Sequence, residues 1–184
     1  SLLSAASDAD IVLLQREIPD AVNIAIAEAA IASGTKVICD VGGMDGTFPV
    51  RLLEVATYIC PNETELARLT DLPVTTKDEA IKAAMKLQRM GANHVMVTRG
   101  EDGSLLVLKD GRVLFQDAIK ASSVEDTTGA GDCFRATFAV GLCEGKTEQQ
   151  SLKLAAAATS LSVAKIGAMT AIPTRKETDL LLAK

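Results

Sequence analysis

The sequence has 184 residues, of which 48% are hydrophobic and 23% are charged, and its formal net charge is −5. This length and apolar content suit one soluble globular domain spanning residues 1–184, with a sizeable core. Acidic and basic residues are interspersed, which excludes the basic surface typical of nucleic-acid binding, and no apolar run is long enough to cross a membrane.

The four cysteines show no paired CxxC spacing, and each lies in apolar sequence: Cys39, Cys60, Cys133 and Cys143. This pattern predicts free thiols in a reducing compartment and argues against disulfides or a zinc site. No signal peptide is recognisable. We therefore expect a cytoplasmic protein, with a plastid as the alternative. Because the sequence begins without an initiator Met, we also expect a presequence or an N-terminal portion to precede residue 1.

Short apolar runs alternate with helical patterns along the chain, and turn residues separate them. In chain order, the sequence predicts a strand at 11–15, a helix at 20–33, strands at 36–41 and 56–61, a helix from Asn62, a helix at 77–90 and a strand at 94–100. Residues 104–108 and 112–116 flank KDG, which is typical of a hairpin. The last third reads as helices at 129–144, at 147–166 and after Pro173.

Buried strands separated by helices predict an α/β fold of three layers, α/β/α, with a mainly parallel central sheet. In such sheets, ligands bind outside the carboxyl ends of the strands. Polar or glycine-rich segments lie at the end of each predicted strand: Glu17 follows the first, Asp40 ends the second, Asn62 follows the third and residues 98–103 follow the fourth. We expect the functional residues at this edge.

Residues 129–132 read GAGD at the start of a predicted helix. Backbone N–H groups at a helix N-terminus lack intrahelical partners and attract anions, including phosphate. An aspartate in the same turn can accept a proton from an attacking hydroxyl. The same four residues also suit an ordinary acidic first turn, so both interpretations stay open on this motif alone.

The longer string DTTGAGDCF at 126–134 resembles the second signature of the ribokinase family, also called the carbohydrate kinases of the phosphofructokinase B group. Three further segments support the resemblance: PNETE at 61–65, TRGEDG at 98–103, and VLLQREIP at 12–19 with DVGGMD at 40–45. The resemblance extends from Ile11 to Pro173 and is strongest to plant-type members. It corresponds to the C-terminal two-thirds of a family member, without the N-terminal sugar motif and the β-sheet lid.

The resemblance implies an ATP-dependent sugar kinase that converts D-ribose to ribose 5-phosphate. Asp132 matches the base that deprotonates the primary hydroxyl of the sugar. Gly129, Ala130 and Gly131 match the anion hole for the transferring phosphoryl group. Glu17 matches a sugar ligand, although a solvated acid after a strand is nearly as common.

The resemblance also implies a nucleotide and magnesium site. Asn62 matches a residue near the nucleotide phosphates, and Glu65 matches one that holds Mg²⁺ through water; a capped helix start is the alternative for both. Six consecutive residues match the family loop that lies beneath ATP: Thr98, Arg99, Gly100, Glu101, Asp102 and Gly103. We expect Arg99 to point outwards, or else to contact an ATP phosphate.

A potassium site is implied next to the GAGD turn. Its ligands would be the side chain of Asp126 and the backbone carbonyl of Thr128, with further carbonyls from Ser162, Lys165 and Gly167. The alternative is that Asp126 only caps the turn at 127–128.

Two positions depart from the family pattern. Arg135 stands where a small or polar residue is usual, and we expect it to pair with Asp132 or to clamp phosphate. Ala156 replaces an Asn that often faces adenine. His94 opens a buried strand and is expected to be structural.

The family lid also dimerises many members, so a homodimer of the full-length protein is expected. Two alternatives to ribose phosphorylation stay open. One is another sugar kinase of the family, such as a fructokinase or a nucleoside kinase, and the other is a non-catalytic ATP-binding protein.

Overall fold

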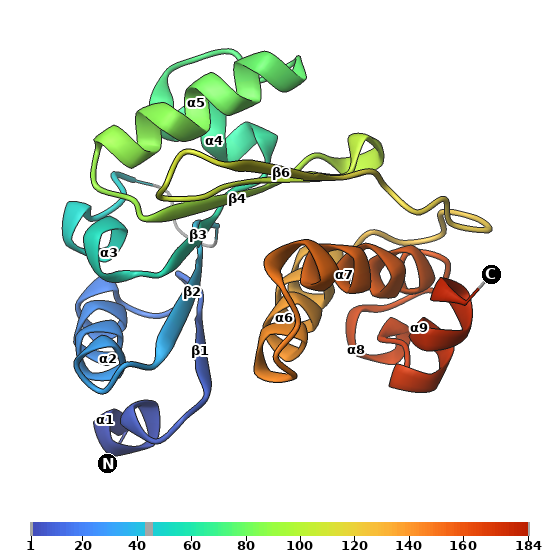
Figure 1. Ribbon diagram of the computed structural model, residues 1–184, viewed down its shortest axis with the longest axis horizontal. Coiled ribbons are helices and arrows are strands. Elements are labelled where there is room, and N and C mark those ends of the chain that lie inside the picture. The colour runs from blue at the N-terminus through green and yellow to red at the C-terminus, as the bar shows by residue number, and fades with distance from the viewer. Residues whose placement is uncertain (1, 43–45, 184) are drawn as a thin grey trace. The chain divides into compact units, whose positions relative to one another are not determined.

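The computed structural model describes residues 2–42 and 46–183 (Figure 1). The chain divides into two compact units. Unit 1 comprises residues 1–99 and 105–114, and unit 2 comprises residues 100–104 and 115–184.

The six strands form a single sheet in the order β1-β2-β3-β4-β5-β6. The first four strands pair in parallel, in the registers Leu13 to Ile38, Ile38 to Tyr58, and Tyr58 to His94. The last two form the predicted hairpin, whose turn is closed by the Leu108 N–H donating to the Arg112 carbonyl oxygen at 2.9 Å. The bounds are β1 (Ile11–Leu14), β2 (Lys36–Asp40), β3 (Tyr58–Cys60), β4 (His94–Thr98), β5 (Ser104–Val107) and β6 (Val113–Gln116). The prediction of an α/β fold with a mainly parallel sheet is confirmed.

The strand order explains where the helices of unit 1 lie. Parallel crossovers are right-handed, so strands added successively in one direction place all their connecting helices on one face of the sheet. Figure 1 shows α2, α3 and α5 along the same face. The helices of this unit are α1 (Leu2–Ser7), α2 (Asp20–Ala32), α3 (Val50–Val55), α4 (Glu63–Thr70) and α5 (Lys77–Arg89).

Helix starts in both units carry a recurrent cap. A Thr or Asn side chain accepts the N–H of the third helical residue, whose Glu or Gln side chain accepts the cap N–H in return. This reciprocal box begins α4, α5, α7 and α9 at Asn62, Thr76, Thr147 and Thr174. These boxes, readable in the sequence, fix where the chain turns into helix.

Unit 2 is mainly helical, with α6 (Ala130–Cys143), α7 (Glu148–Ser162), α8 (Ala168–Ala171) and α9 (Arg175–Leu182). Helices α6 and α7 approach closely where glycine faces serine. A Cβ added at Gly141 would lie 2.9 Å from the Cβ of Ser151, so a larger residue at Gly141 would force the helices apart.

The structure differs from the sequence prediction in several elements. The short helix α8 was not predicted, and β4 ends at Thr98 and not at 100. Helices α1 and α3 have six residues each and were not predicted, because one and a half turns are too short for a helical period to show. Helix α7 ends at Ser162 and not at 166. The expected glycine-rich loop at 42–46 falls partly on 43–45, outside the described residues.

Other expectations concern single residues. Of the four cysteines, Cys39, Cys60 and Cys133 are buried and Cys143 is exposed. His94 stacks on Tyr58 with ring centroids 4.9 Å apart, and its Nδ1 accepts the Lys109 N–H, which is a structural role. None of the helices in the described ranges is both long enough and apolar enough to cross a membrane.

Candidate functional site

The predicted site residues divide between the two units. Unit 1 holds Glu17, Asn62, Glu65, Thr98 and Arg99. Unit 2 holds the glycine loop at 100–103, the segment 126–132, Ala156, Ser162, Lys165 and Gly167.

In unit 1, Asn62 and Glu65 lie where β3 ends and α4 begins. The Glu65 N–H donates to the Asn62 Oδ1 at 2.9 Å, and the Asn62 N–H donates to the Glu65 Oε2 at 2.8 Å. Asn62 also bridges to Thr98 in parallel, and the Thr98 N–H donates to the Pro61 carbonyl oxygen at 3.2 Å. The ends of β3 and β4 are therefore joined, and the capped helix start that was the alternative for Asn62 and Glu65 is present.

A second carboxylate lies near Glu65, contributed by the end of β2. A Cβ at Gly42 would lie 2.9 Å from the Glu65 Oε1 and 3.8 Å from both carboxylate oxygens of Asp40. The missing side chain of Gly42 thus leaves room beside two acids. Mg²⁺ binds oxygen ligands and retains several waters, so this arrangement fits a magnesium ion held largely through water. Asp40 was not assigned a role from sequence, although its position at the carboxyl end of β2 is the signal that would have found it.

Glu17 follows β1 and is exposed, in the loop before α2. Its neighbour Arg16 is 1% exposed and anchors that loop. Arg16 donates to both carboxylate oxygens of Asp20 at 2.9 and 2.8 Å, and its guanidinium lies 4.9 Å from the ring centre of Phe48. The loop that presents Glu17 is therefore fixed by a partly buried ion pair, which the sequence did not reveal.

The expectation that Arg99 points outwards is wrong. Its side chain is 7% exposed, its Nε lies 3.2 Å from the Glu63 Oε1, and its Nη2 donates to the Thr75 carbonyl oxygen at 3.3 Å. Burial of a guanidinium requires such partners, and a carboxylate in the first turn of α4 supplies one. Arg99 thus ties β4 to α4 within unit 1.

In unit 2, the loop residues Gly100, Glu101 and Asp102 form a single 3-10 turn. Gly103 follows with φ +83°, and a Cβ there would lie 2.1 Å from the Gln116 carbonyl oxygen. Only glycine fits this position, because the chain after β6 passes directly against it. The two carboxylates of the turn are exposed.

The GAGD turn begins helix α6 as predicted, with Gly129 as the residue before the helix at φ +75°. The Ala130 N–H donates to the Thr127 carbonyl oxygen at 3.1 Å, so it is used within the turn. Within the described part of the chain, the N–H groups of Gly131 and Asp132 have no hydrogen-bond partner. The Gly129 N–H likewise has no partner in the described ranges. Of the predicted set of Gly129, Ala130 and Gly131, only Ala130 is used within the turn, and the Asp132 amide is available in addition.

The Asp132 carboxylate projects from this first turn and is 77% exposed. Arg135, one turn later, donates from Nη2 to the Asp132 Oδ1 at 2.8 Å. The expected pairing of these two residues is confirmed. Cys133 lies between them in sequence but is buried, and burial raises the pKa of its thiol, so it is a poor nucleophile.

Asp126 links the segment before α6 to the segment after α7. Its Oδ1 accepts the Thr128 N–H at 2.8 Å, and its Oδ2 accepts the Gly167 N–H at 2.9 Å. The Glu125 N–H donates to the Val163 carbonyl oxygen at 2.8 Å, which fixes the same two segments together.

These contacts bring together the residues of the predicted potassium site. The early end of α7 leaves 163–167 as a loop, with Ser162 buried and the Lys165 side chain directed to Glu177 at 3.5 Å. One carboxylate and several backbone carbonyls near one loop are oxygen donors of the kind that bind K⁺. The residues therefore fit a monovalent cation, and the turn-capping alternative for Asp126 is realised at the same time.

Asp126 should make the folding of unit 2 sensitive to acid. Hydrogen bonds from the side chain and backbone of Thr128 and from the Gly167 backbone lower the pKa of its carboxyl below the ordinary 3.8. A carboxyl whose pKa is lower in the folded than in the unfolded state stabilises the fold at pH values above its unfolded-state pKa. This stabilisation is lost as the pH falls to the folded-state pKa. We expect Asp126→Asn to be less stable than the parent at pH 7, with the difference shrinking below pH 3.8.

Urea unfolding of parent and variant between pH 7 and about pH 2.5 measures this convergence, and carboxyl-carbon NMR gives the pKa of Asp126 directly. A stability difference that stays constant down to the lowest pH would contradict the assignment of these hydrogen bonds.

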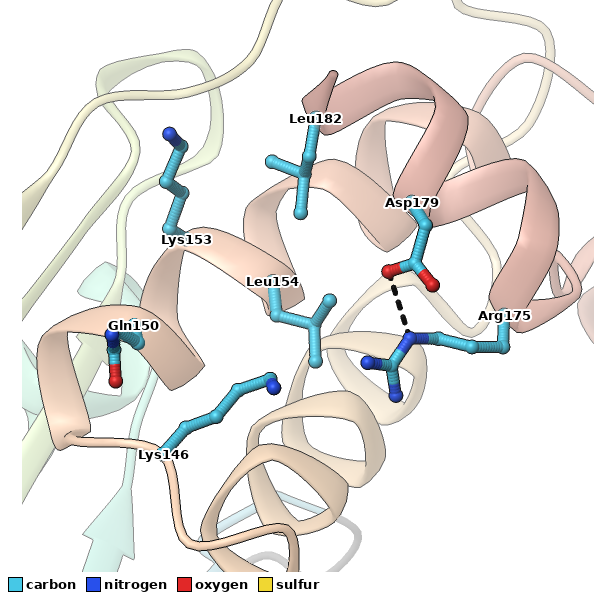
Figure 2. A pocket seen from close by; sticks show the side chains of 7 residues that line it. All are labelled: Lys146, Gln150, Lys153, Leu154, Arg175, Asp179 and Leu182. Atoms are coloured by element: carbon cyan, nitrogen blue, oxygen red, sulfur yellow. Dashed lines mark hydrogen bonds and ion pairs between the residues drawn. The ribbon is translucent and has the colours of Figure 1, made fainter.

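Ala156, the predicted adenine-facing position, lies in α7 and is buried. A separate pocket of about 300 Å³ opens in unit 2 between α7 and α9 (Figure 2). Leu154 and Leu182 line it together with polar side chains, and on its α9 side Arg175 donates to Asp179 at 2.8 Å. No predicted site residue lines this pocket.

Residues 2–175 match the family described as pfkB family carbohydrate kinase. The chain is 46% identical over 180 residues to a ribokinase of Arabidopsis thaliana, which covers 98% of this chain and 48% of that protein. A ribokinase of Haemophilus influenzae is 35% identical over 94% of this chain and 55% of its own length.

Solved structures agree with this relationship. The Arabidopsis thaliana ribokinase in complex with ribose and ATP superposes with a TM-score of 0.95, covering 98% of this chain and 58% of that one. A Thermotoga maritima ribokinase gives a TM-score of 0.87 at 32% identity, over 99% of this chain and 59% of that one. The chain spans about half the length of the curated relatives it matches. The match over nearly all of the sequence and the shared fold show that this chain belongs to the pfkB family of carbohydrate kinases.

Proposed function

We propose that the protein containing this chain is an ATP-dependent sugar kinase that transfers the γ-phosphoryl group of ATP to the primary hydroxyl of D-ribose. The observation that carries this proposal is the first turn of α6. There, the amides of Gly131 and Asp132 lack partners in the described chain, beside an exposed carboxylate on Asp132. The relatives called ribokinases, one of them solved with ribose and ATP, support ribose as the sugar.

Asp132 would accept the proton of the sugar hydroxyl while the hydroxyl oxygen forms its bond to the γ-phosphorus. The bond between that phosphorus and the bridging oxygen of ADP breaks, and ADP leaves with the electron pair. The amides of Gly131 and Asp132 would stabilise the negative charge on the oxygens of the transferring group. The catalytic base and the N–H groups that stabilise negative charge would thus both belong to the first turn of α6.

The other predicted residues would bind and orient. Asn62 and the loop at 98–103 would hold the nucleotide, and Glu17 would hold a sugar hydroxyl. When bound, Mg²⁺ near Asp40 and Glu65 would neutralise phosphate charge. A potassium ion at Asp126, with carbonyls of Thr128, Ser162, Lys165 and Gly167, would stabilise the shape of the GAGD turn.

A coupled assay of ADP formation tests the proposal on the full-length protein with D-ribose, D-fructose and adenosine, each with and without potassium. We expect D-ribose to give the highest kcat/KM and potassium to raise the rate. If fructose or adenosine is turned over faster than ribose, that compound is the substrate, and the assignment of ribose is wrong. Magnesium-dependent ATP binding by calorimetry without turnover of any acceptor would identify a non-catalytic protein.

A further inference from the structure

Arg135 is a largely covered cation beside an exposed carboxylate. The Arg135 side chain is 15% exposed, whereas that of Asp132 is 77% exposed. The two residues are three positions apart on α6, where side chains lie on one face. Of the pair, Arg135 has less room to move, and Asp132 is the side chain whose freedom the contact reduces more.

The guanidinium lies along the first turn of the helix. Its Nη1 lies 3.0 Å from the point where a Cβ on Gly131 would stand, and its Nη2 binds the Asp132 Oδ1. Glycine at 131 therefore makes room for Arg135. In the described ranges, the second carboxylate oxygen of Asp132, Oδ2, has no hydrogen-bond partner.

We propose that Arg135 is a positioning residue for phosphoryl transfer: it holds Oδ1 of Asp132 so that Oδ2 is the oxygen that accepts the proton of the sugar. This inference rests on the proposed function of Asp132 as the base. An exposed carboxylate samples several rotamers, and a charge-assisted hydrogen bond from the less exposed Arg135 guanidinium restricts it to one. Restricting the base to its reactive orientation raises kcat without a new contact to either substrate.

The test compares kcat and KM of the full-length protein with those of Arg135→Ala, Arg135→Gln and Arg135→Lys. Because misplacement of a reacting group costs between about ten- and a hundredfold in rate, we expect Arg135→Ala to lower kcat by at least about tenfold. KM for ribose and for ATP should stay within about twofold, since Arg135 is argued to touch neither substrate. Arg135→Lys should recover part of kcat, and added guanidinium ion should partly rescue Arg135→Ala.

Arg112→Ala is the matched control, because Arg112 also pairs with a nearby aspartate, Asp110, at 2.8 Å on a hairpin turn. It should leave kcat unchanged. Thermal melting identifies any Arg135 variant that fails to fold. If Arg135→Ala does not fold, the kcat of Arg135→Gln, which keeps most of the side chain, is compared with that of the parent.

Three results would overturn the inference: an unchanged kcat in a folded Arg135→Ala, an increased kcat, or a change confined to the KM for ATP. The kcat of Asp132→Asn shows whether only the role of Arg135 is wrong or the proposed function is wrong as well. If Asp132→Asn is inactive while Arg135→Ala is fully active, only the role of Arg135 is lost. If Asp132→Asn is itself active, the proposed function fails as well.

Discussion

Replacing Asp132 with Asn in the full-length protein is expected to lower kcat for ribose phosphorylation by at least about a hundredfold, because the amide cannot accept the proton of the hydroxyl. Asn is nearly the same size as Asp and keeps an oxygen that can accept the Arg135 N–H, so the turn should keep its shape. KM for ATP should change little, because the amides of Gly131 and Asp132 are backbone groups that the substitution retains.

Asp110→Asn is the matched control for this substitution. Asp110 is an exposed aspartate that accepts a hydrogen bond from a neighbouring arginine at 2.8 Å, as Asp132 does. It lies in the hairpin turn, and its replacement should leave kcat unchanged. If Asp132→Asn keeps more than a tenth of the parent kcat while ATP binding is intact, Asp132 is not the base.

The sequence predicted the larger elements because their signals are local. A capping box, such as Asn62 with Glu65, indicates where a helix starts. A buried run rich in β-branched residues, such as the one around Val95, indicates a strand. The shortened α7 could not be predicted in this way. Its helical pattern continues past Ser162, and the helix ends there because the following loop is bonded back to Asp126, a contact that spans 41 positions in the chain.

The candidate site residues were chosen by motif, and some of their partners, such as Arg135 for Asp132, were expected, but others were not. Arg99 was expected outside because a charged residue after a strand is usually solvated, whereas Glu63 and Thr75 bind it inside. Ala130 was expected to offer its amide to an anion, whereas the turn itself uses that amide through Thr127. Hydrogen-bond partners depend on backbone geometry and on distant residues, and a motif encodes neither.

Gly129→Ala is the second change with a large expected effect, because it deforms the turn that presents the amides of Gly131 and Asp132. Gly129 has φ +75°, and an added Cβ would lie 3.0 Å from the Ala168 Cβ and 3.3 Å from its Cα. Backbone at α8 cannot move aside as a flexible side chain can, so the turn itself has to shift. Losing one amide donor from an anion hole costs about 10²- to 10³-fold in kcat, and we expect a loss of at least the lower value.

Gly145→Ala is the control that separates the collision at Gly129 from the loss of stability that any non-glycine residue with a left-handed backbone causes. Gly145 has φ +74°, almost the same as Gly129, but an added Cβ would meet nothing within 4 Å. Both variants should therefore lose about 1–2 kcal/mol of unfolding free energy through the backbone alone. Only Gly129→Ala should lose more stability than this and also lose kcat, because only its Cβ collides with a neighbour. Chemical denaturation and the coupled assay measure the two quantities, and an equal kcat in the two variants would show that the shape of this turn does not govern phosphoryl transfer.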